Sequence, residues 1–220
     1  MAVSTTNTAV VASVAEHTVG LMLGSLRSIP ESHRRLREGD WRPIVGDTLS
    51  GKTVGILGFG RIGSRVASHV SGLGCEVLTY DPMLSEIAKN PATAPFTRVL
   101  DLMELLSRSD LVSIHVPLSK QTVNMIGLRE MQLIGSSGHL INTSRGGVIN
   151  EVDLNEALCT GQLGGAALDV FSREPYEGPL LTAPRLIMTP HIGTQTRSAR
   201  RNMHIEAVGH ILRDLQVPLS

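Results

Sequence analysis

The sequence predicts an α/β protein, a Rossmann-type doubly wound parallel sheet with only remnants of a second domain. Short apolar, β-branched runs alternate with segments of helical periodicity along most of the 220 residues. A glycine-rich hexamer, GFGRIG at residues 58–63, directly follows the first of these runs. Strands that alternate with helices pair in parallel and are covered on both faces. Both observations therefore indicate an open parallel sheet between two layers of helices.

The first predicted element is a long helix over residues 13–29. Ser13 is followed three residues later by Glu16, a capping-box pattern that predicts a helix start at Ser13. Apolar residues recur at helical spacing and also lie on the other faces, so we expect burial on more than one side. A polar, charged helix continues the chain and is expected to stop at Gly39, before a loop that carries Trp41.

The rest of the chain alternates between strand and helix patterns. Apolar runs bounded by turn residues predict buried parallel strands, and apolar spacing of three and four residues predicts helices. The predicted strands are residues 53–57, 75–81, 110–117, 138–144, 164–171 and 185–191. The predicted helices are residues 61–74, 99–109, 127–134, 151–163 and 196–215.

Composition narrows the class of protein. The 20 basic and 20 acidic residues cancel, and aromatic residues make up only 3% of the chain, which argues against a nucleic-acid partner. The two cysteines, Cys75 and Cys159, fall in separate elements and predict free thiols rather than a disulfide framework. No apolar run reaches membrane-spanning length and no signal-peptide pattern opens the chain. We expect a soluble, cytoplasmic protein with no membrane partner.

The hexamer GFGRIG has the context that a dinucleotide site requires, between a predicted strand and a predicted helix. In such a site Gly58 permits the tight turn, Gly60 lets the backbone approach a pyrophosphate, and Gly63 lets helix and strand pack closely. The helix that opens at Arg61 would offer free N–H groups and its positive dipole end to the phosphates.

Asp81 is the candidate ribose-binding acid. It ends the next predicted strand, eighteen residues after Gly63, close to the spacing of about 20 that such sites have. A carboxylate there accepts hydrogen bonds from ribose hydroxyls and repels a 2′-phosphate, so NAD is favoured over NADP. The alternative is a glycine-rich turn beside a surface aspartate, and order and spacing together argue against it.

Three further side chains follow predicted strands at the same edge of the sheet, where open α/β sheets bind ligands. They are Arg145 after INTS, Glu174 beyond AALDVF and His191 after LIMTP. Arginine offers a two-pronged donor for a carboxylate, histidine exchanges protons near neutral pH, and glutamate can fix an imidazole tautomer. Taken singly, each has a plainer interpretation as a loop, turn or structural residue. Together, behind a dinucleotide loop, they suit interconversion of a 2-hydroxy acid and a 2-keto acid.

With these residues the sequence resembles the D-isomer-specific 2-hydroxyacid dehydrogenases, in particular their phosphoglycerate dehydrogenase-like branch. The resemblance implies that Arg145, Glu174 and His191 form the catalytic trio. It also implies that the cofactor is bound by the following residues, several of which the glycine loop already indicates: Gly58, Gly60, Arg61, Ile62, Gly63, Asp81, Val116, Pro117, Thr143, Asp169 and Gly193. The matching stretches are SVAEHTVGLMLGSLRSIPE, LSGKTVGILGFGRIG, GCEVLTYDP, LVSIHVPLSKQTVNMIG, INTSRGGVINEVDL, GGAALDVFSREPYEGPLL and MTPHIGTQT.

The resemblance also predicts a division of the chain. Residues 1–12 would be a remnant strand or linker, residues 13–194 the NAD-binding domain with its connecting helix, and residues 195–220 a C-terminal helix returning toward the substrate domain. A substrate lobe on the order of a hundred residues is expected to be missing before the connecting helix. Two positions depart from the family pattern, Gln195 where a small serine is usual and Asn150 where an acid is usual.

Two functions remain open at this stage. The first is an NAD-dependent oxidoreductase acting on a D-2-hydroxy acid, with turnover expected to be impaired by the missing lobe. The second is a non-catalytic NAD-binding or dimerisation module. A methyltransferase-type nucleotide site would leave the trio unexplained. We also expect a homodimer, because the long helix from Val14 is apolar on too many faces for a monomer surface and the Trp41 loop could reach across to a partner. We expect no metal.

Overall fold

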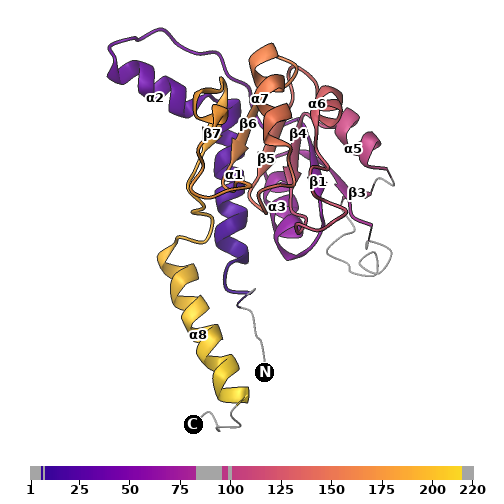
Figure 1. Ribbon diagram of the computed structural model, residues 1–220, viewed down its shortest axis with the longest axis vertical. Coiled ribbons are helices and arrows are strands. Elements are labelled where there is room, and N and C mark those ends of the chain that lie inside the picture. Colours follow the sequence, from indigo (N-terminus) through magenta and orange to yellow (C-terminus); the bar gives the residue numbers. More distant parts are fainter. Residues whose placement is uncertain (1–5, 7, 83–95, 99–100, 215–220) are drawn as a thin grey trace.

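The computed structural model of the chain describes residue 6 and residues 8–82, 96–98 and 101–214. These residues form one seven-stranded parallel sheet with the order β3-β2-β1-β4-β5-β6-β7 (Figure 1). Such an order, with the first strand central and the chain winding outward in both directions, is the doubly wound arrangement that the sequence predicts. The strands are β1 (Thr53–Leu57), β2 (Glu76–Tyr80), β3 (Thr97–Arg98), β4 (Leu111–Ile114), β5 (His139–Asn142), β6 (Gly165–Leu168) and β7 (Leu186–Met188).

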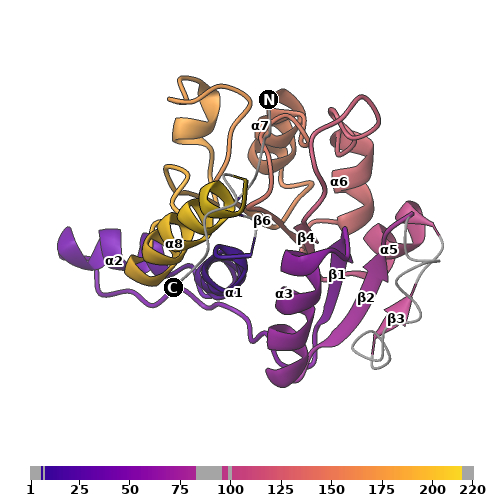
Figure 2. The ribbon, with the colours of Figure 1, turned by 90° about the horizontal axis from the view of Figure 1, so that it is seen from below.

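Helices cover both faces of the sheet (Figure 2). One core lies between the sheet and helices α1 and α3, where Met22, Ile56 and Val66 are fully buried. The second core lies under α5, α6 and α7, with Leu105 and Met131 fully buried. The helices are α1 (Val11–Leu26), α2 (Ile29–Arg37), α3 (Arg61–Gly72), α5 (Leu102–Arg108), α6 (Leu128–Ile134), α7 (Glu151–Thr160) and α8 (Arg197–Asp214), with a 3-10 turn, η2, at Pro179–Thr182.

The structure confirms the six predicted strands and adds the two-residue β3 at the sheet edge. The start predicted for the first helix is wrong. Helix α1 begins at Val11 and its N-cap is Val10. Ser13 is buried inside the first turn, where its Oγ donates to the carbonyl oxygen of Gly193 at 2.6 Å. A serine that bonds a distant segment is not available to cap its own helix, and this is why the capping-box interpretation fails.

The end predicted for this helix is also wrong. Helix α1 stops at Leu26, Ser28 adopts a left-handed φ of 47°, and α2 starts anew at Ile29. Pro30 lacks the N–H that a continuous helix would need at that position, but it is tolerated in the first turn of a new helix. In the predicted helix over residues 99–109, the first two positions lie outside the described residues.

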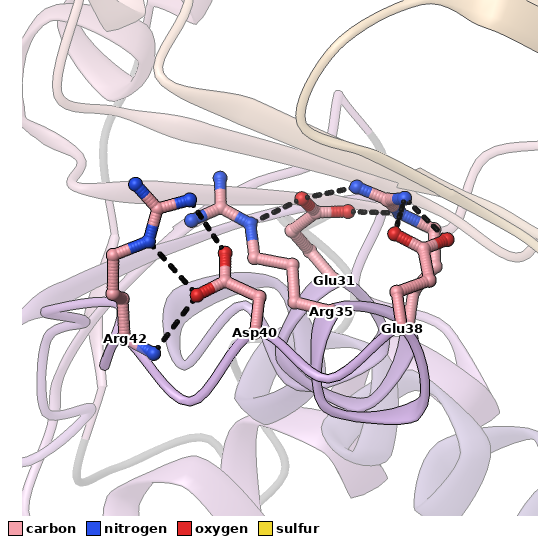
Figure 3. Close-up of polar contacts among 6 residues, drawn as sticks. Glu31, Arg35, Glu38, Asp40 and Arg42 are labelled. Carbon is pink, nitrogen blue, oxygen red and sulfur yellow. Dashed lines mark hydrogen bonds and ion pairs between the residues drawn. The ribbon is translucent and has the colours of Figure 1, made fainter.

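Helix α2 and the loop after it project from the body as an arm, residues 29–48 (Figure 1). None of the residues of α2 is buried. Its charged side chains pair with one another: Glu31 accepts from Arg34 and Arg35, and Arg34 also reaches Glu38 (Figure 3). The hydrogen bonds from Arg34 and Arg35 hold the pKa of Glu31 at about 2. The arm therefore neutralises its own charge.

The C-terminal helix α8 also extends away from the sheet (Figure 1). Its Glu206 accepts hydrogen bonds from the backbone N–H groups of Thr8 and Ala9, just before α1. Among the described residues no helix is long and apolar enough to cross a bilayer.

Candidate active site

The carboxyl ends of the strands form one level edge. Leu57, at the end of β1, aligns with Tyr80 of β2 and with Ile114 of β4. Ile114 aligns with Asn142, and the row continues through the ends of β6 and β7. Every candidate site residue lies one to six positions after the end of the strand that precedes it. The strand order reverses between β1 and β4, the place where doubly wound sheets bind ligands.

The glycine loop joins β1 to α3 at that reversal. Gly58 has a φ of +91°, and a Cβ built on it would lie 2.8 Å from the carbonyl group of His115. Gly63 packs directly on Gly58, leaving no room for a side chain. A Cβ on Gly60 would meet no atom within 4 Å, so the loop leaves open space over the first turn of α3. Free N–H groups at a helix start beside open space fit a pyrophosphate.

Asp81 lies beside this loop. Its Oδ2 accepts a hydrogen bond from the backbone N–H of Phe59 at 2.8 Å. Val116, two residues after the end of β4, borders the loop, with its Cγ1 2.9 Å from the Cβ position of Gly58. The side chain of Ile62 packs against the core under α1 and α3. These residues come together at one end of the edge, whereas Pro117 is exposed just beyond them.

The other end of the edge carries the histidine and the glutamate. His191 Nδ1 and Glu174 Oε2 lie 2.8 Å apart, and the side chains are 47% and 37% exposed. Burial opposes ionisation of Glu174, but hydrogen bonds from His191 and from the Phe171 N–H outweigh it, so the pKa of this carboxyl lies below its usual value. The pair borders a cavity of about 620 Å³ lined mainly by Phe171, Tyr176, Leu181, Met188 and Pro190.

Asp169 fixes the backbone that carries His191. Its Oδ1 accepts from the Ile192 N–H and its Oδ2 from the Gly193 N–H, each at 2.8 Å, and Thr189 donates its hydroxyl to Oδ1. Burial raises the pKa of Asp169, but a hydrogen bond from His17 and those just described lower it more, so the carboxyl stays ionised. His191 itself adopts a left-handed φ of 52°. A residue other than glycine with this uncommon backbone conformation needs surrounding contacts that hold it in place.

Three polar side chains of helix α1 reach this edge. Ser13 bonds the Gly193 carbonyl oxygen, His17 Nε2 lies 3.3 Å from Asp169 Oδ1, and Thr18 Oγ1 lies 2.8 Å from Thr143 Oγ1. Sequence reasoning assigned Ser13 to the helix cap and gave His17 and Thr18 no role. The signal for a contact with the site was the presence of these polar residues beside the apolar face of the helix.

Arg145 lies in a loop that Asn142 holds. The buried Asn142 side chain donates to the Arg145 carbonyl oxygen at 3.0 Å and accepts from the Ser144 N–H at 3.0 Å. The Arg145 guanidinium is exposed and reaches only its neighbour's carbonyl oxygen, at 2.7 Å, among the contacts described. Gly146, which follows, lies against the Phe171–Ser172 peptide so closely that a Cβ would collide with it. This contact brings the arginine loop beside the glutamate loop.

The two departures from the family pattern have local roles. Asn150 is the N-cap of α7, where its Oδ1 accepts from the backbone N–H groups of Val152 and Asp153. Gln195 accepts from the guanidinium of Arg200 at 2.7 Å. Within the described part of the chain, no group of three or more His, Cys, Asp or Glu side chains could hold a metal ion.

The fold and the glycine loop define a dinucleotide-binding α/β domain with a histidine–carboxylate pair at its ligand edge. Residues 19–193 match the family model described as "D-isomer specific 2-hydroxyacid dehydrogenase, NAD binding domain". The chain belongs to this family.

Curated relatives agree with this membership. The chain is 38% identical over 195 residues to a D-3-phosphoglycerate dehydrogenase of Archaeoglobus fulgidus, an alignment that covers 87% of the chain and 36% of the relative. It is 36% identical over 211 residues to a hydroxypyruvate reductase of Thermotoga maritima, covering 93% of the chain and 67% of the relative. The chain therefore spans only about a third of the length of the phosphoglycerate dehydrogenase it matches.

Solved structures show the same architecture. A 2-hydroxyacid dehydrogenase from Ketogulonicigenium vulgare superposes with a TM-score of 0.87 at 29% identity, over 99% of this chain and 69% of that one. A D-lactate dehydrogenase from Aquifex aeolicus, solved with NAD and lactic acid, superposes with a TM-score of 0.85 at 28% identity, over 97% of this chain and 72% of that one.

Proposed function

We propose that the chain belongs to an NAD-dependent oxidoreductase that interconverts a D-2-hydroxy acid and a 2-keto acid. The observation that carries this proposal is the His191–Glu174 pair, with its 2.8 Å contact, at the same sheet edge as Arg145 and the glycine loop. A cavity beside the pair gives a small organic acid a place to bind.

NAD is the proposed cofactor. The glycine loop with Gly58, Gly60 and Gly63 and the start of α3 at Arg61 would hold the pyrophosphate, and Asp81 would accept hydrogen bonds from the ribose hydroxyls. Thr143, Asp169 and Gly193, after β5, β6 and β7, would hold the nicotinamide part of the cofactor, and Ile62, Val116 and Pro117 would contact the rest of it. Bound NAD supplies the hydride acceptor for the alcohol and, once reduced, the donor for the ketone.

Arg145, His191 and Glu174 have separate roles in substrate binding and proton transfer. Arg145 binds the substrate carboxylate and carbonyl through its two-pronged guanidinium. His191 accepts the hydroxyl proton at Nε2 during oxidation and returns it during reduction, since its Nδ1 faces Glu174. Glu174 fixes the imidazole orientation and stabilises its protonated form.

A second candidate function is a non-catalytic NAD-binding or dimerisation module. The exposure of the pair favours it, because 47% of the His191 side chain and 37% of the Glu174 side chain face solvent. Hydride transfer needs a closed, water-poor site.

We also propose a cytoplasmic homodimer in which the arm, residues 29–48, contacts a second copy. Trp41 is 82% exposed and Val45 95% exposed in this arm. A hollow of about 880 Å³ lies between the arm and the body, bordered by Ile44, His139 and Arg185.

The enzyme proposal is tested by following NADH oxidation with glyoxylate, hydroxypyruvate and phosphohydroxypyruvate, alongside calorimetric titration with NAD. Saturable oxidation that His191→Ala abolishes supports the enzyme. NAD binding without reduction of any of these 2-keto acids supports the module, and absence of dinucleotide binding contradicts both.

A further inference from the structure

The geometry points to Glu151 as a positioning residue: through Ser172, it fixes the segment that aims the Glu174 carboxylate at His191. This inference rests on the proposed function for its catalytic consequence. The contacts on which it stands do not depend on that function.

Glu151 holds Ser172 with both carboxylate oxygens. The Ser172 backbone N–H donates to Oε1 at 2.6 Å, and the Ser172 hydroxyl donates to Oε2 at 2.8 Å. The two residues are 21 positions apart in the chain. A two-point contact of this kind fixes the rotation of the peptide as well as its position, and hydrogen bonds to a charged acceptor are stronger than neutral ones.

The neighbouring peptide is held by the catalytic glutamate. The Phe171 N–H donates to Glu174 Oε1 at 3.0 Å, while Oε2 of the same carboxylate faces His191 Nδ1 at 2.8 Å. Successive N–H groups, of Phe171 and Ser172, are therefore bound by two different carboxylates. Releasing the Ser172 N–H frees the peptide next to the one that orients Glu174.

Glu151 belongs to a helix that is capped at its start and packed against the core. It is the first residue of α7, whose start is capped by Asn150 and whose Leu154 and Leu158 are buried. Gly146, five residues before Glu151, contacts the same Phe171–Ser172 peptide. The segment that carries Arg145 and the segment that carries Glu174 thus meet at two points, Gly146 and Glu151. Glu151 therefore fixes the position of the Glu174 segment relative to the Arg145 segment.

A plainer role for Glu151 is stabilisation of the start of α7, because a negative charge there interacts favourably with the helix dipole. That role requires no contact with Ser172. The two roles differ in what they do to Glu174, and this difference decides the experiment.

The experiment compares four variants of the full chain. Glu151→Ala removes both hydrogen bonds to Ser172. Glu151→Gln keeps them, since the amide oxygen accepts from the N–H and the amide nitrogen donates to the hydroxyl oxygen, but it loses the charge. Glu156→Ala is the matched control, an exposed glutamate on the same helix. Ser172→Ala removes only the hydroxyl bond and serves as a milder variant should Glu151→Ala fail to fold.

The first readout is NMR titration of the Glu174 side-chain carboxyl carbon, which needs neither substrate nor turnover. We expect Glu151→Ala to raise the Glu174 pKa toward its usual value, because the Phe171 bond weakens. Glu151→Gln and Glu156→Ala should leave the titration close to wild type, and Ser172→Ala should fall between. A Glu151→Ala protein with lower thermal stability but an unchanged Glu174 titration would overturn the inference in favour of the helix-start role.

The second readout is turnover. We expect kcat of Glu151→Ala to fall by about tenfold or more, with a much smaller change in KM, because the acid–base pair is misaligned while substrate binding by Arg145 persists. Glu151→Gln should recover most of kcat. If the wild-type chain oxidises no NADH yet the Glu174 titration responds as expected, the proposed function fails and the positioning role stands. If turnover is present and equal in all variants, the positioning role is contradicted.

Discussion

The hydroxyl of Ser13 donates a hydrogen bond to the carbonyl oxygen of Gly193, 180 positions further along the chain, at 2.6 Å. Ser13 lies in the first turn of α1, and Gly193 lies two residues after His191. The nitrogen of Gly193 is bound at the same time by Asp169. The carbonyl group of Gly193 is therefore fixed by α1, and its N–H by Asp169, which directly follows β6. These two contacts restrain the loop that carries His191.

Replacing Ser13 by Ala should loosen this loop. The buried carbonyl oxygen of Gly193 would lose the partner that Ser13 provides, and the expected loss of stability is about 1–3 kcal/mol. We expect kcat to fall as well, because His191 lies next to the released segment. Urea unfolding measures the first effect and NADH oxidation the second. Ser71→Ala, an exposed serine on α3, is the control. Equal stability of the Ser13 and Ser71 variants would show that the contact contributes nothing.

Asp81 should decide which dinucleotide binds. We expect the wild-type chain to bind NAD more tightly than NADP, because a carboxylate beside the loop accepts from ribose hydroxyls and repels a 2′-phosphate. Asp81→Ala or Asp81→Ser should weaken NAD binding more than NADP binding. Asp81→Asn keeps an acceptor for the Phe59 N–H but removes the charge, so it separates loop support from repulsion. Calorimetric titration with both dinucleotides measures the preference, and tighter NADP binding by the wild type would refute it.

The sequence predicted the sheet because strand identity depends on local patterns. Apolar runs bounded by turn residues, such as residues 53–57, are a local signal for buried strands, and the glycine loop obeys a fixed spacing. It could not predict where α1 starts, because the Ser13 hydroxyl bonds a residue 180 positions away rather than its own helix. The break at Ser28 escaped notice for a different reason, since Pro30 is compatible with both a helix end and a helix start.

The candidate site shows the same difference between features set by local sequence patterns and features set by contacts between distant residues. Arg145, Glu174 and His191 are recognisable because their chemistry is distinctive and each follows a strand. Residues that support them, such as Asn142 and Glu151, use ordinary polar groups on backbone atoms of distant segments. Their role appears only when the loops are brought together in space, so no motif in one stretch of chain reveals it.

His115 should make stability depend on pH. Burial lowers the pKa of His115 from 6.5 to about 3, and its Nε2 lies 2.9 Å from the Ser113 hydroxyl. Between pH 6.5 and 3 the unfolded chain binds a proton at this position that the folded chain does not. Stability from this group is therefore complete above pH 6.5 and declines as the pH falls, by at most about 1.4 kcal/mol per pH unit.

The measurement for His115 is urea unfolding between pH 4 and 8. We expect His115→Gln to flatten the pH dependence relative to wild type, whereas His33→Gln, at an exposed position on α2, should not. Parallel stability curves for wild type and His115→Gln would contradict the assignment of this histidine as neutral in the folded chain.

Arg145 and His191 should be indispensable for turnover in different ways. Arg145→Ala should abolish most activity, and Arg145→Lys should not restore it, because an ammonium lacks the two-pronged geometry. His191→Ala should remove the step that depends on pH, leaving a flatter pH profile of kcat. NADH oxidation with a panel of 2-keto acids measures both, and wild-type rates in either alanine variant would exclude the proposed mechanism.

The arm should bury its tryptophan against a second copy of the chain. Helix α2 has no buried residue, and an isolated helix of nine residues is marginal in water, so the arm would gain stability from a partner surface. Light scattering at micromolar concentration should give twice the chain mass of 23.6 kDa. Trp41 is the one tryptophan of the chain, so its fluorescence reports directly on the arm.

We expect Trp41 emission to shift to shorter wavelength as protein concentration rises, because dimerisation removes the ring from water. Val45→Asp should place a charge in the contact and shift the equilibrium toward monomer, while Val123→Asp, at an exposed valine in the loop after β4, should not. A monomeric mass together with a concentration-independent, solvent-like Trp41 spectrum would show that the arm stands free and that the dimer proposal is wrong. A dimeric mass with that same spectrum would place the contact on another surface.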